Sequence, residues 1–168
     1  SYDDMITLRF RASLNFSNRT STGFTLFELI VTVSIVAILM TVAVPGIRQI
    51  IDSNRMTAYV NSLVSGVHLA RSEAIKRNET MEFRAGVEGS RGDWSRGWTV
   101  VDVDGTVVAS SSNEYTKLVA SADSSTVSFD GEGIPSGPLD IDLTVEGING
   151  RRLTISRVGA VQSGKLEN

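Results

Sequence analysis

Three residues near the start of the chain, Gly23, Phe24 and Glu28, combine a cleavable bond with an isolated charge. Gly23 has no side chain, so a protease can approach its backbone closely. Removal of residues 1–23 would leave a positive α-amino group on Phe24. Glu28 is the one charged residue among the 21 residues at 24–44, which are otherwise almost entirely apolar, and a charge there is costly unless it is partnered. We therefore predict that Glu28 pairs with the amino group of a neighbouring subunit when helices bundle.

Other residue types that support catalysis or metal binding are sparse. His68 is the one histidine and there is no cysteine, which leaves little material for a catalytic triad or a metal site. The pairs Asp102/Asp104 and Asp140/Asp142 would each share a strand face, but Ca²⁺ takes 6–8 oxygen ligands and solvated strand faces commonly carry such pairs. No phosphate-binding loop, nucleophile elbow or dinucleotide fingerprint is present. We expect the protein not to be an enzyme and to have no cofactor or metal.

The element that must position Glu28 is the apolar run itself. As a helix, residues 24–44 would span ~30 Å, the thickness of a bilayer core. A secretory signal peptide would have a shorter apolar core without a carboxylate. A plain membrane anchor explains the length but gives no reason for Glu28 or Gly23. In an isolated anchored subunit, Glu28 could also snorkel to the headgroups, so both interpretations of its charge apply at different stages.

The segment Gly-Phe-Thr-Leu-Phe-Glu at 23–28, followed by Pro45, resembles the class III signal of type IV prepilins. In that family a membrane aspartyl peptidase cuts after the glycine and methylates the new N-terminal phenylalanine. The resemblance implies a leader at 1–23 and cleavage between Gly23 and Phe24, with Phe24 N-methylated. It also implies that residues 24–45 cross the inner membrane once, and that the C-terminal domain is periplasmic before it joins a filament.

The helical pattern continues beyond Pro45, which we expect to kink the helix because proline lacks a backbone donor. Apolar residues then recur every three or four positions and define one helix face: Met56, Tyr59, Val60, Leu63, Val67, Ala70 and Ala74. Lys76, Arg77 and Asn78 are typical of a helix end. We therefore predict one long helix over 24–78, with a transmembrane half and an amphipathic half that packs on the rest of the chain.

After residue 79 the apolar period changes to two, as in strands. Candidate strands are 81–84, 98–103, 106–109, 117–121, 126–130, 139–146 and 151–158. Asp104-Gly105 indicates one hairpin and 148–150 a second. We predict an α+β fold, with the amphipathic helix covering about seven short antiparallel strands in a β domain over 79–168.

Within the prepilins, three stretches resemble the minor pilins and pseudopilins of the FimT/FimU/GspH group: residues 68–78, 94–98 and 127–133. This resemblance implies a two-sheet β domain and a low-abundance structural subunit near the filament tip. Its partners would be the prepilin peptidase, other minor pilins or pseudopilins, and the major subunit. The filament would be a type IV pilus or a type II secretion pseudopilus, which one sequence does not separate.

The alternative function is DNA uptake at a pilus tip. FimT-like members that bind DNA carry a Gly-Arg-x-Arg motif, whereas the matching stretch here, 159–162, has neither arginine. Without residues 1–23 the chain has 13 basic and 17 acidic residues. DNA binding needs several contacts from Lys or Arg side chains to phosphates. The available candidates are Arg151, Arg152, Arg157 and Lys165. We therefore do not expect nucleic acid to be a partner.

Overall fold

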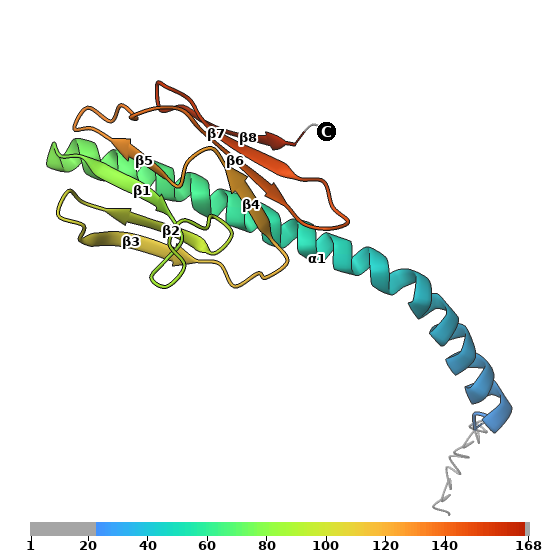
Figure 1. Cartoon of the computed structure of the whole chain (residues 1–168). Helices are drawn as coiled ribbons and strands as arrows, with labels where there is room; N and C mark the ends of the chain where they lie inside the picture. Colours follow the sequence, from blue (N-terminus) through green and yellow to red (C-terminus); the bar gives the residue numbers. More distant parts are fainter. Residues whose placement is uncertain (1–22, 167–168) are drawn as a thin grey trace, which may run out of the picture. The chain divides into compact units, whose positions relative to one another are not determined.

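A long helix is followed by eight strands in residues 23–166, the part of the chain that this computed structural model describes (Figure 1). The helix, α1, runs over Leu26–Arg77. The chain divides into two units, 1–40 and 41–168. The predicted leader, apart from Gly23, lies outside the described residues.

In the first unit, the described residues form the start of α1, and their large apolar side chains are all exposed. Two hydroxyl groups in this stretch bond back to helix carbonyls: Thr32 donates to the carbonyl of Glu28 at 2.9 Å and Ser34 to that of Ile30 at 2.7 Å. These bonds satisfy the hydroxyls within the helix, which suits an apolar environment. For the membrane-span criterion, α1 consists of two parts, Leu26–Thr41 and Gly46–Arg77, separated by a short break. Among the described residues, neither part alone has the length and apolarity of a membrane span, but the two parts together meet both conditions.

The second unit contains two antiparallel four-stranded sheets beside the later part of α1 (Figure 1). The first sheet has the order β3-β2-β1-β5, from Val107–Ser112, Gly97–Val101, Met81–Ala85 and Thr126–Phe129. The second has the order β4-β6-β7-β8, from Val119–Ala122, Leu139–Thr144, Arg151–Ile155 and Val161–Lys165. The predicted α+β class, with its two-sheet domain, is confirmed.

The core lies between α1 and the inner faces of both sheets. All seven residues of the predicted helix face are buried, from Met56 to Ala74. They pack in one cluster with alternate residues of the strands, such as Phe83, Ile141 and Leu153. Polar residues on the other side of the helix, such as Asp52, Asn61 and Ser72, are exposed or half-buried. The amphipathic half of the helix is therefore confirmed residue by residue.

A glycine brings the first sheet unusually close to the helix. A side-chain carbon at Gly66 would lie 2.7 Å from the Phe83 ring and 2.8 Å from the Trp98 indole. The Phe83 ring also packs against Trp94 and Trp98, with centroid separations of 5.2 and 5.7 Å. Hydrogen bonds reinforce this contact, because the Trp98 indole N–H donates to the Ser62 hydroxyl at 2.9 Å. The Tyr59 hydroxyl donates to the Trp94 carbonyl, and burial raises the pKa of Tyr59.

The end of α1 is closed by a left-handed residue. Asn78 has a φ of 52°, and the next N–H, of Glu79, donates to the Ala74 carbonyl at 3.2 Å. The Asn78 N–H donates to the Ile75 carbonyl at 3.3 Å, which completes a Schellman motif. The predicted helix end is therefore confirmed, and asparagine is one of the few residues that adopt this φ readily.

Several strand boundaries differ from the predicted ones. β2 ends at Val101 rather than at 103, because Asp102 turns the chain: its Oδ1 accepts the N–H groups of Asp104 and Thr106 at 3.1 and 2.7 Å. The hairpin at Asp104-Gly105 is confirmed, with a longer connection. The hairpin at 148–150 is also confirmed, but β7 ends at Ile155. β8 was not predicted, so the described residues hold eight strands rather than seven.

Candidate functional site

The N-terminal segment around Glu28 begins with a helix cap. Thr25 precedes the helix, and its Oγ1 accepts the N–H of Glu28 at 3.1 Å. The Thr25 carbonyl accepts the N–H of Leu29 at 3.1 Å. Thr25 is therefore the N-cap residue, and Glu28 occupies the third helical position. The pattern Thr-x-x-Glu is that of a capping box, so the sequence carried this signal although Thr25 was not among the predicted site residues.

The cap defines where the charge of Glu28 lies. Its carboxylate is in the first turn of α1, where the helix dipole favours a negative charge. Phe24 precedes the cap and is 75% exposed, and Gly23 is exposed as well. The Gly23–Phe24 bond is therefore exposed and lies outside the helix.

The apolar side chains around this carboxylate are exposed. Leu26 and Phe27 are 78% and 76% exposed, and this exposure continues along the first half of α1. Burial of large apolar side chains stabilises by roughly 1.5–3 kcal/mol each, so exposed ones in such a row mark a surface meant for lipid or for other helices.

A polar cluster holds the start of the amphipathic half to the β domain. The Lys117 ammonium lies 3.1 Å from the Asp52 carboxylate, and the Arg55 guanidinium lies 5.4 Å from the centre of the Tyr115 ring. The Tyr115 hydroxyl and then the Lys117 ammonium lower the pKa of Asp52. The Tyr115 hydroxyl makes no hydrogen bond of regular geometry with the described residues. The ion pair with Lys117 is therefore the better-defined contact of Asp52. Burial, and then the neighbouring Asp52 carboxylate, raise the pKa of Tyr115 to about 12.

The four candidate DNA-contact residues do not form one patch. Arg151 and Lys165 are directly opposite each other on β7 and β8. Arg152, the next residue along β7, makes a two-pronged ion pair with Asp142 at 2.6 and 2.8 Å. This pairing lowers the pKa of Asp142. Arg157 lies in the turn after β7 and is exposed. Only Arg151 and Lys165 are therefore brought together.

One member of each carboxylate pair considered for Ca²⁺ has another role. Asp102 caps its own turn, and Asp142 binds Arg152. No group of three or more metal-binding side chains occurs within the part of the chain that the structure describes. His68 is exposed on α1.

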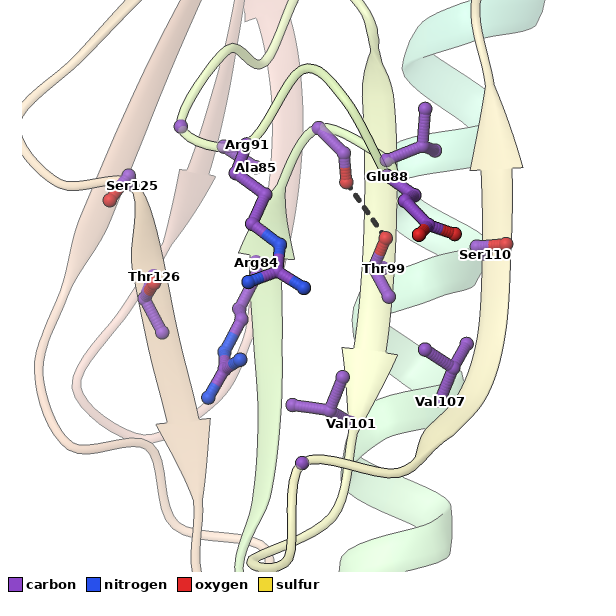
Figure 2. Close-up of a pocket in the computed structure, with 14 residues that line it drawn as sticks. Arg84, Ala85, Glu88, Arg91, Thr99, Val101, Val107, Ser110, Ser125 and Thr126 are labelled. Carbon is purple, nitrogen blue, oxygen red and sulfur yellow. Dashed lines mark hydrogen bonds between the residues drawn. The ribbon is translucent and has the colours of Figure 1, made fainter.

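A pocket of about 590 Å³ lies on the outer face of the first sheet, under the loop after β1 (Figure 2). Arg84 and Arg91 both point into it, and Thr99 donates a hydrogen bond of 2.8 Å to the Gly86 carbonyl at its edge. Arg84 is already bound by Glu82, and Glu88 also lines the pocket. The charge of the pocket is therefore mixed, and no predicted site residue contributes to it.

Comparison with known families decides where this fold belongs. Residues 59–159, more than half of the chain, match the model described as type II transport protein GspH. The chain belongs to the GspH family. A second model, for the prokaryotic N-terminal methylation motif, matches residues 18–44. The GspH family comprises minor pilins and pseudopilins, which are structural proteins rather than enzymes. No curated protein matches the chain significantly.

Solved structures show the same fold as this GspH-family chain. The type IV minor pilin FimU of Pseudomonas aeruginosa superposes with a TM-score of 0.56 at 21% identity, over 66% of this chain and 89% of FimU. The minor pseudopilin EpsH of the Vibrio cholerae type 2 secretion system gives a TM-score of 0.52 at 13% identity, over 66% of this chain and 97% of EpsH. The matched GspH region begins at Tyr59, within the helix face that packs on the sheets.

Proposed function

We propose that this chain is a minor subunit that prepilin peptidase cleaves between Gly23 and Phe24 and methylates on Phe24. Residues 24–45 then hold it in the inner membrane with the β domain in the periplasm. It subsequently assembles through its N-terminal helix, near the tip of a type IV pilus or of a type II secretion pseudopilus. Its partners are other minor pilins or pseudopilins and the major subunit.

The observation that carries this proposal is a capped helix start with one carboxylate, Glu28, on an otherwise apolar and exposed surface. After cleavage, the α-amino group of Phe24 and the carboxylate of Glu28 flank the Thr25 cap of the same subunit. Within one subunit the two groups are poorly placed to meet, but staggered neighbours can bring them together. In an apolar bundle an unpaired charge costs several kcal/mol, so this pairing would fix the register between subunits as well as their affinity.

The first test concerns processing. Intact-mass analysis of protein extracted from membranes is expected to show the loss of residues 1–23 and the gain of one methyl group. Gly23→Val should block the cut, because the side chain obstructs the close approach of the protease. Retention of the leader in the parent protein would contradict the proposal.

The second test concerns assembly. Glu28→Ala should leave cleavage and membrane insertion intact but reduce recovery of the subunit with sheared filaments or with crosslinked partner pilins. Glu28→Asp, shorter by one methylene, should give an intermediate recovery. If Glu28→Ala assembles like the parent, the carboxylate only snorkels and helix packing alone drives assembly.

A further inference from the structure

A groove of about 600 Å³ lies in the second unit, between the part of α1 that begins at Gly46 and one end of the second sheet. Residues 46–54 of the helix form one side. The other side is the turn at 147–150 together with Arg151 and Lys165. None of the residues that line this groove is acidic, although the chain as a whole has more acidic than basic residues.

The two bases of the groove are placed as an anion would require. Arg151 and Lys165 are directly opposite each other on antiparallel strands, which places their side chains on the same face with Cβ atoms roughly 5 Å apart. Like charges in this position repel and destabilise a sheet. No ion pair joins either of them to a carboxylate within residues 23–166. An anion between them would remove the repulsion.

The remaining groups of the groove favour phosphate as that anion. A guanidinium group can bind two phosphate oxygens at once, and an ammonium group binds phosphate as a point charge. The side-chain amides of Gln49, Asn54 and Asn149 add neutral donors. Ile50, which also lines the groove, is 62% exposed, so the groove combines an apolar edge with cationic groups.

The position of the groove along the chain favours a lipid as the source of the phosphate. Gly46 follows the apolar run by two residues, and at 1.5 Å per residue positions 46–50 extend only ~3–9 Å beyond its end. The headgroup layer on each side of a bilayer is about 5–8 Å thick. DNA is favoured less, because the groove has two basic side chains rather than a row of them along a phosphate backbone. In addition, no aromatic side chain on which a nucleobase could stack lines the groove.

We propose that this groove binds the headgroup phosphate of an anionic phospholipid in the periplasmic leaflet, and so seats the β domain on the membrane before assembly. The placement of the groove at the membrane surface rests on the proposed membrane anchoring of residues 24–45. The binding of phosphate by the groove does not rest on that anchoring.

The test is lipid retention by the processed full-length chain in detergent, measured by native mass spectrometry with phosphatidylglycerol or phosphatidylcholine. The parent should retain phosphatidylglycerol preferentially. Because each base near a membrane surface changes affinity about fivefold, Arg151→Gln with Lys165→Gln should weaken phosphatidylglycerol binding by tenfold or more. Retention of phosphatidylcholine should not change.

A matched control is Arg91→Gln with Arg157→Gln, which removes the same charge from two exposed positions outside the groove. This control should bind phosphatidylglycerol like the parent. Lys165→Gln alone changes an exposed position and should give an intermediate loss of phosphatidylglycerol binding. This single variant keeps the test interpretable if the double variant misfolds. Melting curves of all variants complete the comparison.

Several results would overturn the proposal. One is equal retention of the two lipids by the parent, and another is unchanged retention by the groove variants. Displacement of the lipid by millimolar inorganic phosphate would point to a free anion as the ligand. Displacement by an oligonucleotide at ~150 mM salt would point to nucleic acid, and displacement by a partner pilin to a subunit contact. Intact mass and membrane fractionation test the anchoring separately, so failure of one proposal is distinguishable from failure of the other.

Discussion

At the scale of single residues, the proposed assembly gives Glu28 two electrostatic relationships that would act at different times. In an isolated helix its charge is favoured by the first-turn amides, whose order depends on the Thr25 cap. In a bundle the amino group of a neighbour would compete for the same carboxylate. Because the helix-dipole contribution is typically 0.3–1 kcal/mol, an apolar bundle would favour the full opposite charge. The cap therefore orders the segment without preventing the assembly contact.

The first prediction concerns this cap. Thr25→Ala removes the acceptor for the Glu28 N–H and should cost about 1 kcal/mol in stability of the first turn. Hydrogen exchange of the Glu28 amide in micelles should accelerate severalfold, whereas Thr25→Ser should behave like the parent. Unchanged exchange in Thr25→Ala would mean that another group caps the helix.

A second prediction concerns Asp52, whose pKa is lowered in the folded protein by Tyr115 and Lys117. A carboxylate with a depressed folded-state pKa contributes stability above its unfolded value, near 3.9, and this contribution is lost as the pH falls through the folded value. Asp52→Asn should therefore lower the melting temperature at pH 7, and the difference from the parent should disappear as the pH falls through the lowered pKa of Asp52. A constant difference across this range would show that packing rather than charge explains the loss.

At the scale of elements, the predictions from the sequence were most accurate where a single buried face determines the pattern of apolar residues. The buried positions of α1 follow the helical period because a single face contacts the sheets, so all seven were identified. β8 was missed because Val-Gln-Ser-Gly-Lys is mostly exposed and lacks the alternation that marks a half-buried strand. Strand order was not predicted, because it depends on contacts distant in sequence. The turn at Asp102 shortened β2 through a side-chain bond that apolar patterns do not report.

A third prediction tests the closest helix-to-sheet contact. Gly66→Ala should gain up to ~1 kcal/mol of helix propensity, but the added carbon meets two aromatic rings, and such overpacking costs about 1–3 kcal/mol. We expect net destabilisation in chemical unfolding. Gly46→Ala is the matched control, because nothing lies within 4 Å of the added carbon, and it should be neutral or stabilising.

A fourth prediction tests the assigned helix face. Leu63 is fully buried, so Leu63→Asp places an unpaired charge in the core and should cost several kcal/mol. The exposed neighbour Asn61→Asp should change stability by less than about 0.5 kcal/mol. If both variants melt like the parent, the helix face is assigned wrongly.

At the scale of the whole molecule, the second unit contains its own core and the first contributes no buried side chain among residues 23–40. A chain of residues 52–168 keeps Asp52 and the whole helix face, and it should be a soluble, folded monomer by size-exclusion chromatography. A chain that starts at residue 62 lacks Met56, Tyr59 and Val60 and should aggregate or melt much earlier. Equal behaviour of the two would contradict the described core.

The charge of the whole molecule gives a further prediction. Since Arg152 is bound to Asp142 and only Arg151 and Lys165 of the other candidates lie together, residues 52–168 should not retard DNA in a gel shift at ~150 mM salt. Retardation at that salt, and its loss in Arg151→Gln with Lys165→Gln, would instead support the DNA-uptake function.

The buried aromatic contact between helix and sheet has a practical consequence for spectroscopy. The chain has two tryptophans, Trp94 and Trp98, and both are buried against Phe83. The apolar segment at 24–44 contains none, so tryptophan emission from the intact protein arises entirely from the β domain. A red shift would therefore report separation of the sheet from the helix and be blind to insertion of the anchor. This native optical signal allows the folding of the domain to be followed within lipid, without an attached dye.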